Sequence, residues 1–391
     1  MTGTSERRTT LLTEGLARLG DRSRVGTRLG PSLDLLRVGR EFLGVRRDAA
    51  AVQQWSARVR RDTYRRIWDD AAARLGAVRE DLGPDFTRIS RGEVSTVTRY
   101  HEVMLDTAVH LMLALDKGVV HSLLTERGLP VSRFVIVDAD DRSAGLDFVL
   151  GSEKPCVVKP LNASGGRGVT CGVDSGEAFL RAAVWARRWD PTLLVEEQAL
   201  GQEIRFLFLD GLLIGILRRR PPALRGDGRS TVMQLIGAEN RRRAGADGAL
   251  GLSDLSIDLD TLLTLAGDNS SLHTVPDNGA TVPVSTTANQ SGADDTDRLA
   301  RESVSAALID EARDAVDAIG LRLGSVEVIT PDPTRSLASA RGVVLEVNGT
   351  PGLHYHYFVS NADEADHVAI PILATLLGDD PAAHVPDEST R

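Results

Sequence analysis

The fold is decided by residues 154–173, which read Lys154-Pro155-Cys156-Val157-Val158-Lys159-Pro160-Leu161-Asn162-Ala163-Ser164-Gly165-Gly166-Arg167-Gly168-Val169-Thr170-Cys171-Gly172-Val173. A β-branched run ends in Lys159-Pro160, three glycines follow within four positions, and residues 169–173 are typical of a second strand. Two strands joined by such a loop can fold over a polyphosphate, because glycine lets backbone N–H groups approach the oxygens closely. A plain hairpin turn is the alternative interpretation. The loop is not a Walker A motif, since no Gly-Lys-Ser/Thr follows it.

Lysine is rare in this chain, which makes each lysine informative. The sequence has 46 Lys and Arg residues, of which only Lys117, Lys154 and Lys159 are lysines. Codon bias accounts for the general use of Arg, but a site fitted to a compact ammonium does not easily accept a planar guanidinium. We therefore take Lys117 and Lys159 as functional cations, and we expect Lys154, beside a proline at a turn, to face solvent.

The composition is that of an ordinary globular protein of two or three lobes, with 391 residues, 42% of them hydrophobic. The net charge is −9, but residues 1–100 carry 20 Arg and 13 acids and hence +7, which leaves −16 for the rest. We interpret the basic part as a solvated helical surface and exclude nucleic acid as substrate, because the remainder is acidic. No apolar run is long enough for a membrane span and no hydrophobic signal core is present, so we expect a cytoplasmic protein without membrane contact. Cys156 and Cys171 are then buried core thiols without a redox role.

Hydrophobic periodicity predicts an α/β chain with a helical N-terminal part. Residues 7–47 show too little periodicity to assign, and the tail beyond Gly378 is expected to fray. The polar segment 266–297 is predicted to be a lid or a binding loop, since long loops inside compact proteins usually serve function. The predicted helices cover 49–78, 100–115, 117–128, 176–189, 232–240 and 301–319, and the predicted strands cover 133–137, 156–160, 169–173, 192–196, two strands within 203–217, 325–330 and 342–348.

Three oxygen-bearing side chains lie on the last two predicted strands. Glu327 is on one, and Glu346 and Asn348 are two residues apart on the other, so that the latter two point to the same face. Such ligands suit Mg²⁺, which keeps waters and takes further ligands from nucleotide phosphates. A polar strand end is the alternative, but the lysine and glycine loop upstream favour a metal site.

Together these features resemble the ATP-grasp superfamily, and within it the ATP-grasp domain of cyanophycin synthetase and its ligase relatives. The similarity runs from about Asp116 to His356 and rests on motifs in a fixed order. They are Asp116-Lys117 before Gly128-Leu129-Pro130; Val157-Val158-Lys159-Pro160 with Gly165-Gly166-Arg167-Gly168-Val169-Thr170; Val195-Glu196-Glu197 with Gly201-Gln202-Glu203-Ile204-Arg205; Pro221-Pro222 with Gly226-Asp227-Gly228-Arg229-Ser230-Thr231; Val275-Pro276 and Asn289; Gly324-Ser325-Val326-Glu327-Val328-Ile329-Thr330-Pro331-Asp332; and Glu346-Val347-Asn348-Gly349-Thr350-Pro351-Gly352.

The resemblance implies an ATP-grasp fold, in which two α/β lobes grip ATP. It implies a mainly helical N-terminal domain over 1–115, an N-terminal lobe with the glycine loop over 116–195, and a C-terminal lobe with the metal site and lid loop over 196–385.

The resemblance also implies a role for each site residue. Lys117 and Lys159 would contact the phosphates and the adenine side of ATP, under a loop formed by Ser164, Gly165, Gly166 and Gly168. Glu196, with the backbone of Glu197 and Ala199, would read the adenine amino edge, and Glu203 would bind the ribose hydroxyls. Glu327, Glu346 and Asn348 would hold two Mg²⁺, with Mn²⁺ as an alternative ion, and Arg205, Arg219 and Arg229 would face the γ-phosphate and the acyl group.

The sequence also departs from the family pattern. Arg229 stands in place of a usual Lys, Glu327 in place of Asp, and Arg218 in place of a common Glu. His354 replaces an Arg, which leaves the acyl-acceptor side open, although we expect His354 and His356 to contact substrate rather than zinc. No second ligase domain follows the ATP-grasp core, so we do not expect repeating polymer synthesis.

The implied function is that of an ATP-dependent carboxylate–amine ligase. A carboxylate of an amino acid or peptide would be activated as an acylphosphate and coupled to an amine, releasing ADP and phosphate, in a specialised biosynthetic pathway. A kinase that stops at a phosphorylated product and a non-catalytic nucleotide-binding regulator are the alternatives, and a P-loop fold is a weaker one. Relatives of this kind are often dimers or tetramers, and a homodimer is the assembly we expect. The sequence does not identify the acid, the amine or the role of residues 1–100.

Overall fold

The computed structural model describes residues 49–163, 165–245 and 254–385. The chain divides into two units, Met1–Ala50 and Ala51–Arg391, and all but the first two of the described residues belong to the second. Ser164 of the predicted glycine loop, the unassigned residues 7–47 and the end of the tail lie outside the described residues.

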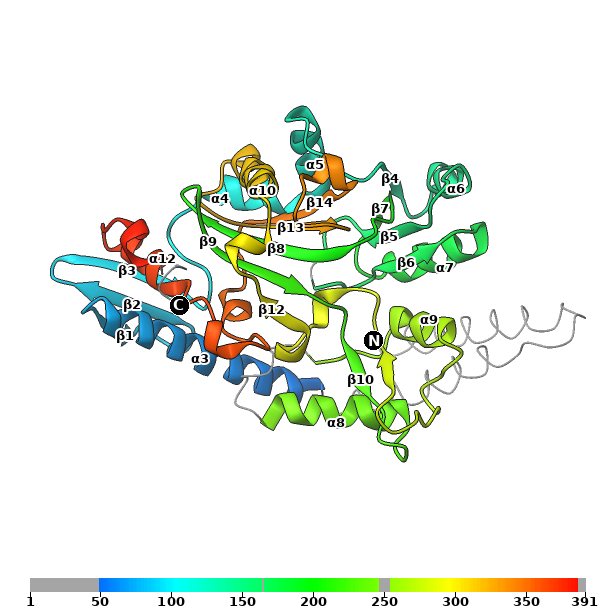
Figure 1. Cartoon of the computed structure of the whole chain (residues 1–391), viewed down its shortest axis with the longest axis horizontal. Coiled ribbons are helices and arrows are strands. Elements are labelled where there is room, and N and C mark those ends of the chain that lie inside the picture. Colours follow the sequence, from blue (N-terminus) through cyan, green and yellow to red (C-terminus); the bar gives the residue numbers. More distant parts are fainter. Residues whose placement is uncertain (1–48, 164, 246–253, 386–391) are drawn as a thin grey trace, which may run out of the picture. The chain divides into compact units, whose positions relative to one another are not determined.

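One sheet carries the glycine hairpin. It has four antiparallel strands in the order β4-β7-β5-β6, with β4 at Phe134–Asp138, β7 at Thr192–Glu197, β5 at Cys156–Pro160 and β6 at Thr170–Val173. Helices α6 (Ser143–Leu150) and α7 (Gly176–Ala186) pack on this sheet and lie beside each other (Figure 1). Ser175 starts α7 by accepting a hydrogen bond from the N–H of Ala178. Apolar side chains such as Val158, Phe179 and Val195 form the core between helices and sheet.

A second, five-stranded antiparallel sheet forms the centre of the unit. Its order is β12-β9-β8-β13-β14, and its strands are β8 (Gln202–Leu209), β9 (Leu212–Arg219), β12 (Thr296–Arg298), β13 (Leu323–Thr330) and β14 (Val343–Asn348). Helix α10 (Ala306–Ile319), with α4 (Ala108–Leu115) and α5 (Lys117–Glu126), covers one face (Figure 1). The short helix α11 (Leu337–Ala340) packs beside β14.

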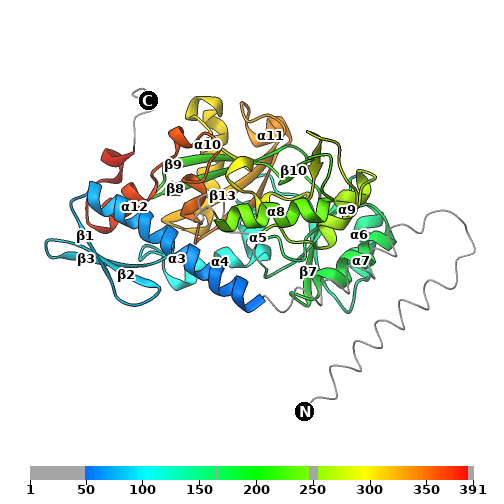
Figure 2. The ribbon, with the colours of Figure 1, turned by 90° about the horizontal axis from the view of Figure 1, so that it is seen from below.

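The opposite face of this sheet is covered by the N-terminal helix α3 (Ala49–Arg74) and by α12 (Ala369–Leu376). Successive side chains of a strand point to opposite faces, and β8 shows this clearly. Phe206 and Phe208 join the core under α10, whereas Leu207 and Leu209 join the core that contains Trp68 of α3. Both faces of the sheet are therefore buried. Figure 1 shows α10 above this sheet and α3 below it, and Figure 2, seen from below, shows α3 in front of the sheet.

A three-stranded sheet, β1-β2-β3, follows α3 and was not predicted. Its strands are β1 (Val78–Asp81), β2 (Phe86–Arg91) and β3 (Val94–Arg99). The predicted helix 49–78 ends early because Gly76 adopts a left-handed φ of 64° that terminates α3. The predicted helix 100–115 begins only at Ala108, where Thr107 caps α4 by accepting a hydrogen bond from the N–H of His110. The preceding Asp106 accepts hydrogen bonds from the N–H groups of Arg322 and Leu323.

The segment after β9 adds a small subdomain. It contains a two-stranded antiparallel sheet of β10 (Ala223–Arg225) and β11 (Thr281–Pro283), with helices α8 (Val232–Gly245) and α9 (Leu259–Gly267) between the two strands in the chain. The predicted polar loop 266–297 therefore contains the end of α9, β11, two 3₁₀ turns (Ala288–Gln290 and Ala293–Asp295) and part of β12. Short elements with few apolar residues leave little periodicity, which explains why they were missed.

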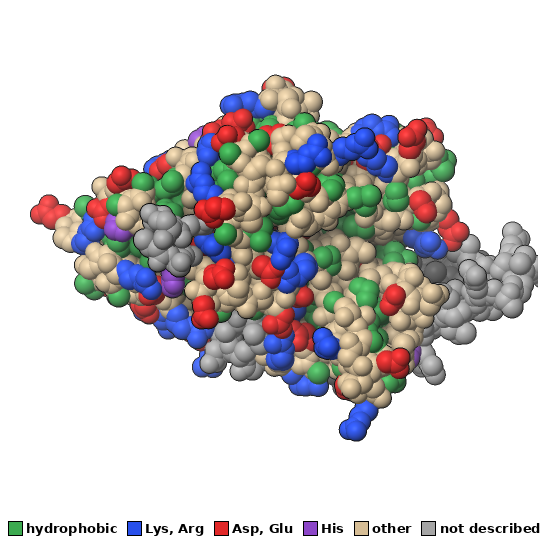
Figure 3. Space-filling model, in the orientation of Figure 1, with side chains coloured by type: hydrophobic (Ala, Val, Ile, Leu, Met, Phe, Trp, Pro, Cys, Tyr) green, Lys and Arg blue, Asp and Glu red, His purple; other side chains and the backbone are tan. Residues whose placement is uncertain are grey.

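The surface charges are mixed. In Figure 3 the Lys and Arg side chains are interspersed with Asp and Glu, and arginines of α3 form ion pairs with nearby acids, as in Arg65–Asp81 and Arg74–Asp70. This agrees with a solvated helical surface in the described part of the N-terminal region. Within the residues that the structure describes, no helix has the length and apolar character needed to cross a membrane.

Candidate active site between two sheets

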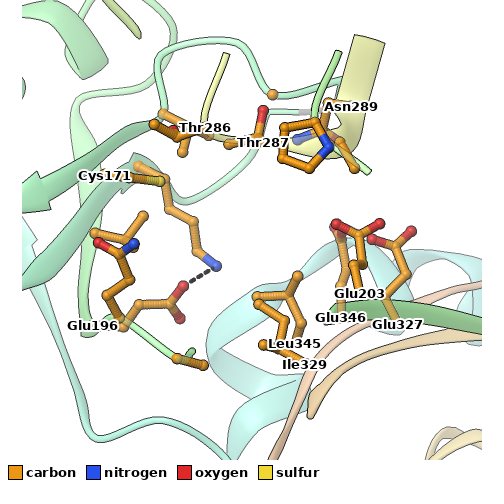
Figure 4. A pocket seen from close by; sticks show the side chains of 18 of the residues that line it. Cys171, Glu196, Glu203, Thr286, Thr287, Asn289, Glu327, Ile329, Leu345 and Glu346 are labelled. Carbon is orange, nitrogen blue, oxygen red and sulfur yellow. Dashed lines mark hydrogen bonds and ion pairs between the residues drawn. The ribbon is translucent and has the colours of Figure 1, made fainter. Parts of the chain in front are cut away.

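A cavity of about 460 Å³ lies between the glycine hairpin and the five-stranded sheet (Figure 4). Its walls come from β5, β6 and β7 on one side, from β8, β9, β13 and β14 on the other, and from residues 286–289. Of the predicted site residues, the following line it: Lys117, Lys159, Gly165, Gly166, Glu196, Glu197, Ala199, Glu203, Arg219, Glu327 and Glu346.

The glycine loop forms one rim of the cavity. Gly165 and Gly166 have φ of 69° and 71°, a backbone conformation that residues other than glycine rarely adopt. A Cβ atom on Gly166 would lie 2.8 Å from the side chain of Asn289, so the loop packs directly against the segment that was predicted to be a lid. Gly168 does not line the cavity, and its backbone packs against Pro160 and Trp189 instead.

Lys159 lies on β5 at the inner wall of the first sheet. Its Nζ donates a hydrogen bond to Oε1 of Glu196 at a distance of 2.6 Å, and both residues are more than nine-tenths buried. The pair is therefore held in a defined geometry, because a buried ammonium without a partner would be costly. Lys154, by contrast, is exposed, as predicted from the turn.

Lys117 connects the two sides of the cavity. Asp116 caps the start of α5 by accepting hydrogen bonds from the N–H groups of Gly118 and Val119, and this places Lys117 at the first helical position. Its Nζ donates to the carbonyl of Ala163 in the glycine loop at 3.0 Å, and lies 3.5 Å from Oε1 of Glu346 on β14.

Acidic side chains gather at the far end of the cavity. Glu327 of β13 lies directly opposite Glu346 of β14 in the strand register, and Asn348 lies opposite Ser325. Figure 4 shows Glu203, Glu327 and Glu346 close to one another. Like charges at such cross-strand positions repel, so this end of the cavity requires cations.

Two buried arginines supply positive charge at this end. Arg205 of β8 hydrogen-bonds to Glu327. Arg219 of β9 lies 3.0 Å from Glu203 and 3.7 Å from Glu327. Arg205 is adjacent to the cavity rather than on its wall, and Asn348 likewise contacts Glu327, with its Nδ2 3.4 Å from Oε1.

Burial and nearby charge shift the pKa values of Glu203 and Glu327 in opposite directions. Burial raises the pKa of Glu203 to about 7, in spite of Arg219. Burial also acts to raise the pKa of Glu327, but Arg205 and Arg219 outweigh it and hold that pKa below its usual value. Glu327 therefore stays ionised beside a carboxyl that takes up protons more readily.

The acidic end fits a divalent cation that is shared with a ligand. Glu327, Glu346 and the amide oxygen of Asn348 are hard oxygen donors on adjacent strands, and Mg²⁺ commonly completes such a set with water and phosphate. In the described ranges 49–163, 165–245 and 254–385, no group of three or more His, Cys, Asp or Glu side chains is arranged to hold a metal ion. Two carboxylates and one amide oxygen leave coordination positions that phosphate oxygens and water would fill, so this donor set fits an ion that arrives with phosphates.

The middle of the cavity has apolar walls. Val157 of β5 lies on one side, and Ile329 and Leu345 lie on the other, a lining that suits a flat ring such as adenine. The N–H of Glu197 donates to the carbonyl of Arg133, so that N–H is not free to read a base.

Some predicted residues lie elsewhere. Arg229 is exposed on the turn before α8, where its N–H donates to Asp227, and it does not line the cavity. His354 and His356 are buried and do not line the cavity either, so the structure does not place them where we expected substrate. Cys156 is a core residue as predicted, but Cys171 lines the cavity, where burial raises its thiol pKa to about 11.

Sequence reasoning missed two parts of the site. Thr286 and Thr287 line the cavity; they lie in the segment 266–297 predicted to be a lid or binding loop, but neither was singled out as a site residue. Tyr355 was also missed, although its ring lies 5.0 Å from the guanidinium of Arg205 and 4.9 Å from that of Arg219. Its position between two histidines was the available signal.

The fold is the ATP-grasp fold, as expected from the motifs. A bifunctional glutathione synthetase from Pasteurella multocida shares it, with a TM-score of 0.53 and 20% identity over 80% of this chain and 44% of that chain. No protein-family model matches the chain.

In sequence the chain resembles cyanophycin synthetase. It is 32% identical to the cyanophycin synthetase of Nostoc sp. (strain PCC 7120) over 62% of this chain and 27% of that protein. It is also 27% identical to the glutathione biosynthesis bifunctional protein GshAB of Listeria innocua, over 75% of this chain and 38% of that protein. The chain thus spans between about a quarter and two fifths of the length of these curated relatives.

Proposed function

We propose that the protein is an ATP-dependent carboxylate–amine ligase that uses Mg²⁺. It activates the carboxylate of an amino acid or short peptide as an acylphosphate and couples it to an amine, releasing ADP and phosphate. The observation that carries the proposal is that Lys159 and the Glu327–Glu346 pair, far apart in the sequence, line the same cavity. Similarity to cyanophycin synthetase and to the glutathione biosynthesis protein supports the class of reaction.

In this proposal each side of the cavity binds a different part of the nucleotide. The adenine lies between Val157 and the pair Ile329 and Leu345, and Lys159 and Lys117 bind phosphate oxygens beneath the glycine loop. Ammonium groups suit this role because they are compact and strongly hydrated point charges.

The acidic end would carry the metal. Glu327, Glu346 and Asn348 would hold Mg²⁺, which neutralises charge on the transferring phosphoryl group when bound. Glu327 would then exchange its contact with Arg205 for the metal, and the buried Arg219 would bind the phosphoryl oxygens and the acyl group. We assign Glu203 to the cavity floor beside Arg219 and Glu327, and its ribose contact remains a prediction.

The segment 286–289 would help to exclude water. It lines the cavity and packs against Gly166 of the glycine loop. An acylphosphate is destroyed by water, so a covered cavity serves the reaction.

The experiment that tests the proposal is a screen for ADP release with ATP, Mg²⁺ and single amino acids or short peptides, with and without amines. Hydroxylamine added to the reaction separates ligase from kinase, because an acylphosphate gives a hydroxamate and a stable phosphoester does not. Formation of a hydroxamate that depends on both ATP and the acid supports the ligase. Nucleotide binding without any turnover across the screen would support the regulator instead.

A further inference from the structure

Tyr355 stands out because it contacts both buried arginines without pairing with their charges. Its ring centroid is 5.0 Å from the guanidinium carbon of Arg205 and 4.9 Å from that of Arg219. Aromatic faces attract guanidinium groups, and they do so without occupying the N–H groups as a carboxylate does.

This property matters because the arginines and the metal compete for the same carboxylate. Without ligand, Arg205 is held by its ion pair with Glu327, and Arg219 is held by Glu203 at 3.0 Å and more loosely by Glu327 at 3.7 Å. If Glu327 binds a metal with the nucleotide, the two guanidinium groups lose part of that support and must still be directed at the phosphates. The face of Tyr355 can hold them in both states.

Tyr355 is itself supported from the N-terminal part of the chain. The ring of His354 lies 4.1 Å from the ring of Tyr355, centroid to centroid. The hydroxyl of Tyr64, on helix α3, hydrogen-bonds with Nδ1 of His354 at 2.8 Å. Tyr64 is 2% exposed and His354 is 9% exposed. We call these three residues the Tyr64–His354–Tyr355 column.

The column has the electrostatic character that this role requires. Burial lowers the pKa of His354 well below its usual value, and His101, Arg60, Arg205 and Arg219 lower it further. A neutral imidazole neither repels the arginines nor pairs with Glu327, so the column acts by packing and by one hydrogen bond. A cation at position 354 would lie beside two buried guanidinium groups.

We propose that Tyr355 is a positioning residue that aligns Arg205 and Arg219 with the terminal phosphate, and that helix α3 fixes it there through Tyr64 and His354. The inference rests on the proposed function, since it takes the arginines to face the γ-phosphate. It gives helix α3, which lies outside the region of resemblance that begins near Asp116, a part in the active site.

The test compares binding of Mg²⁺–AMP-PNP, a non-hydrolysable ATP analogue, with binding of Mg²⁺–ADP by calorimetry. Tyr355→Leu is expected to weaken AMP-PNP about tenfold while ADP changes less than about twofold. Tyr355→Phe keeps the aromatic face and should keep the wild-type ratio of AMP-PNP affinity to ADP affinity. Tyr64→Phe should shift the ratio in the same direction as Tyr355→Leu, but less.

Tyr357→Phe is the matched control. Tyr357 lies on the same segment, is largely buried, and accepts a hydrogen bond from the N–H of Ala369, but its ring contacts His367 rather than the column. Loss of the Tyr357 hydroxyl should lower the melting temperature without altering the ratio of AMP-PNP affinity to ADP affinity.

Two results would overturn the inference. In one, the ratio is unchanged in Tyr64→Phe and in folded Tyr355→Leu. In the other, both nucleotides weaken together in step with the melting temperature, as for Tyr357→Phe. If the wild-type protein binds neither nucleotide, the proposed function fails and the inference fails with it. If the wild-type protein binds both nucleotides and one of the two results above is found, only the inference fails.

Discussion

The two ends of the cavity are built in different ways. At the glycine hairpin, one buried ion pair, Lys159–Glu196, joins two adjacent strands of one sheet. At the other end, Glu203, Glu327 and Glu346 on three strands are neutralised by Arg205, Arg219 and Lys117. The charge at the hairpin end depends on a single ion pair, whereas the negative charge at the acidic end is balanced by three basic side chains together. A single substitution should therefore have its largest effect at the hairpin end.

Lys159→Met is expected to have the largest effect. It removes one of the two lysine ammonium groups from the cavity and leaves Glu196 buried without its partner, so nucleotide affinity should fall about 100-fold and the free energy of unfolding by about 3 kcal/mol. Calorimetry with ADP and urea unfolding measure the two. The matched control is Lys154→Met, five residues earlier and exposed, which should leave both unchanged. Equal effects of the two substitutions would contradict a special role for Lys159.

Glu346→Gln should have a smaller effect, confined to the metal. Glu346 is about one-third exposed and pairs only loosely with Lys117, so the fold should tolerate the loss of charge. We expect the gain in AMP-PNP affinity on adding Mg²⁺ to shrink about tenfold, because one oxygen donor of the metal set is weakened. Titrations with Mg²⁺ and with EDTA measure this gain. Glu302→Gln, on an exposed 3₁₀ turn, serves as the control.

His356 should make stability depend on pH without touching the cavity. Burial, with Arg205, lowers the pKa of His356 to about 3, so the folded state binds fewer protons than the unfolded state below the ordinary pKa of 6.5. The stability from this residue is present above pH 6.5 and is lost as the pH falls towards 3. In His356→Phe the fall in unfolding free energy between pH 6.5 and 4 should be shallower, by up to about 1.4 kcal/mol per pH unit. Identical slopes in urea unfolding would contradict this.

Cys171 should show the smallest effect. Its raised thiol pKa predicts slow alkylation by iodoacetamide at pH 7, with bound ADP slowing it further, because the thiol lines the cavity. Mass spectrometry after timed labelling follows the reaction. Cys171→Ser should bind ADP within about twofold of wild type, and rapid labelling that ADP does not affect would place the thiol outside the cavity.

The same difference explains how much the sequence could predict. The hairpin end is encoded within one continuous stretch, so Lys159 and the glycine loop were found from local pattern alone. The acidic residues were also found, because they sit at fixed positions of regular strands. Their basic partners Arg205 and Arg219 were predicted as site residues too, but the pairing of Arg219 with Glu203 and Glu327 was not, since it depends on how β8, β9 and β13 align.

Local pattern misled where tertiary contacts decide. The segment before α4 is not helical, because Asp106 accepts hydrogen bonds from backbone N–H groups of Arg322 and Leu323 far along the chain and Thr107 caps the helix only after it. Tyr355 acquires its role only from arginines on β8 and β9. His354 was noted as a departure from the family pattern, but its partner Tyr64 lies on a helix that the resemblance does not cover.

The central claim is that one nucleotide is held between the glycine hairpin and the acidic end of the same cavity. A crystal structure with Mg²⁺ and AMP-PNP tests it most directly. The account predicts adenine between Val157 and Leu345, phosphates against Lys159, and a metal ion on Glu327 and Glu346. It would be contradicted by a nucleotide bound elsewhere. It would also be contradicted if the Lys159–Glu196 and Glu327–Arg205 ion pairs stayed intact and the phosphates contacted neither Lys159 nor a metal ion on Glu327.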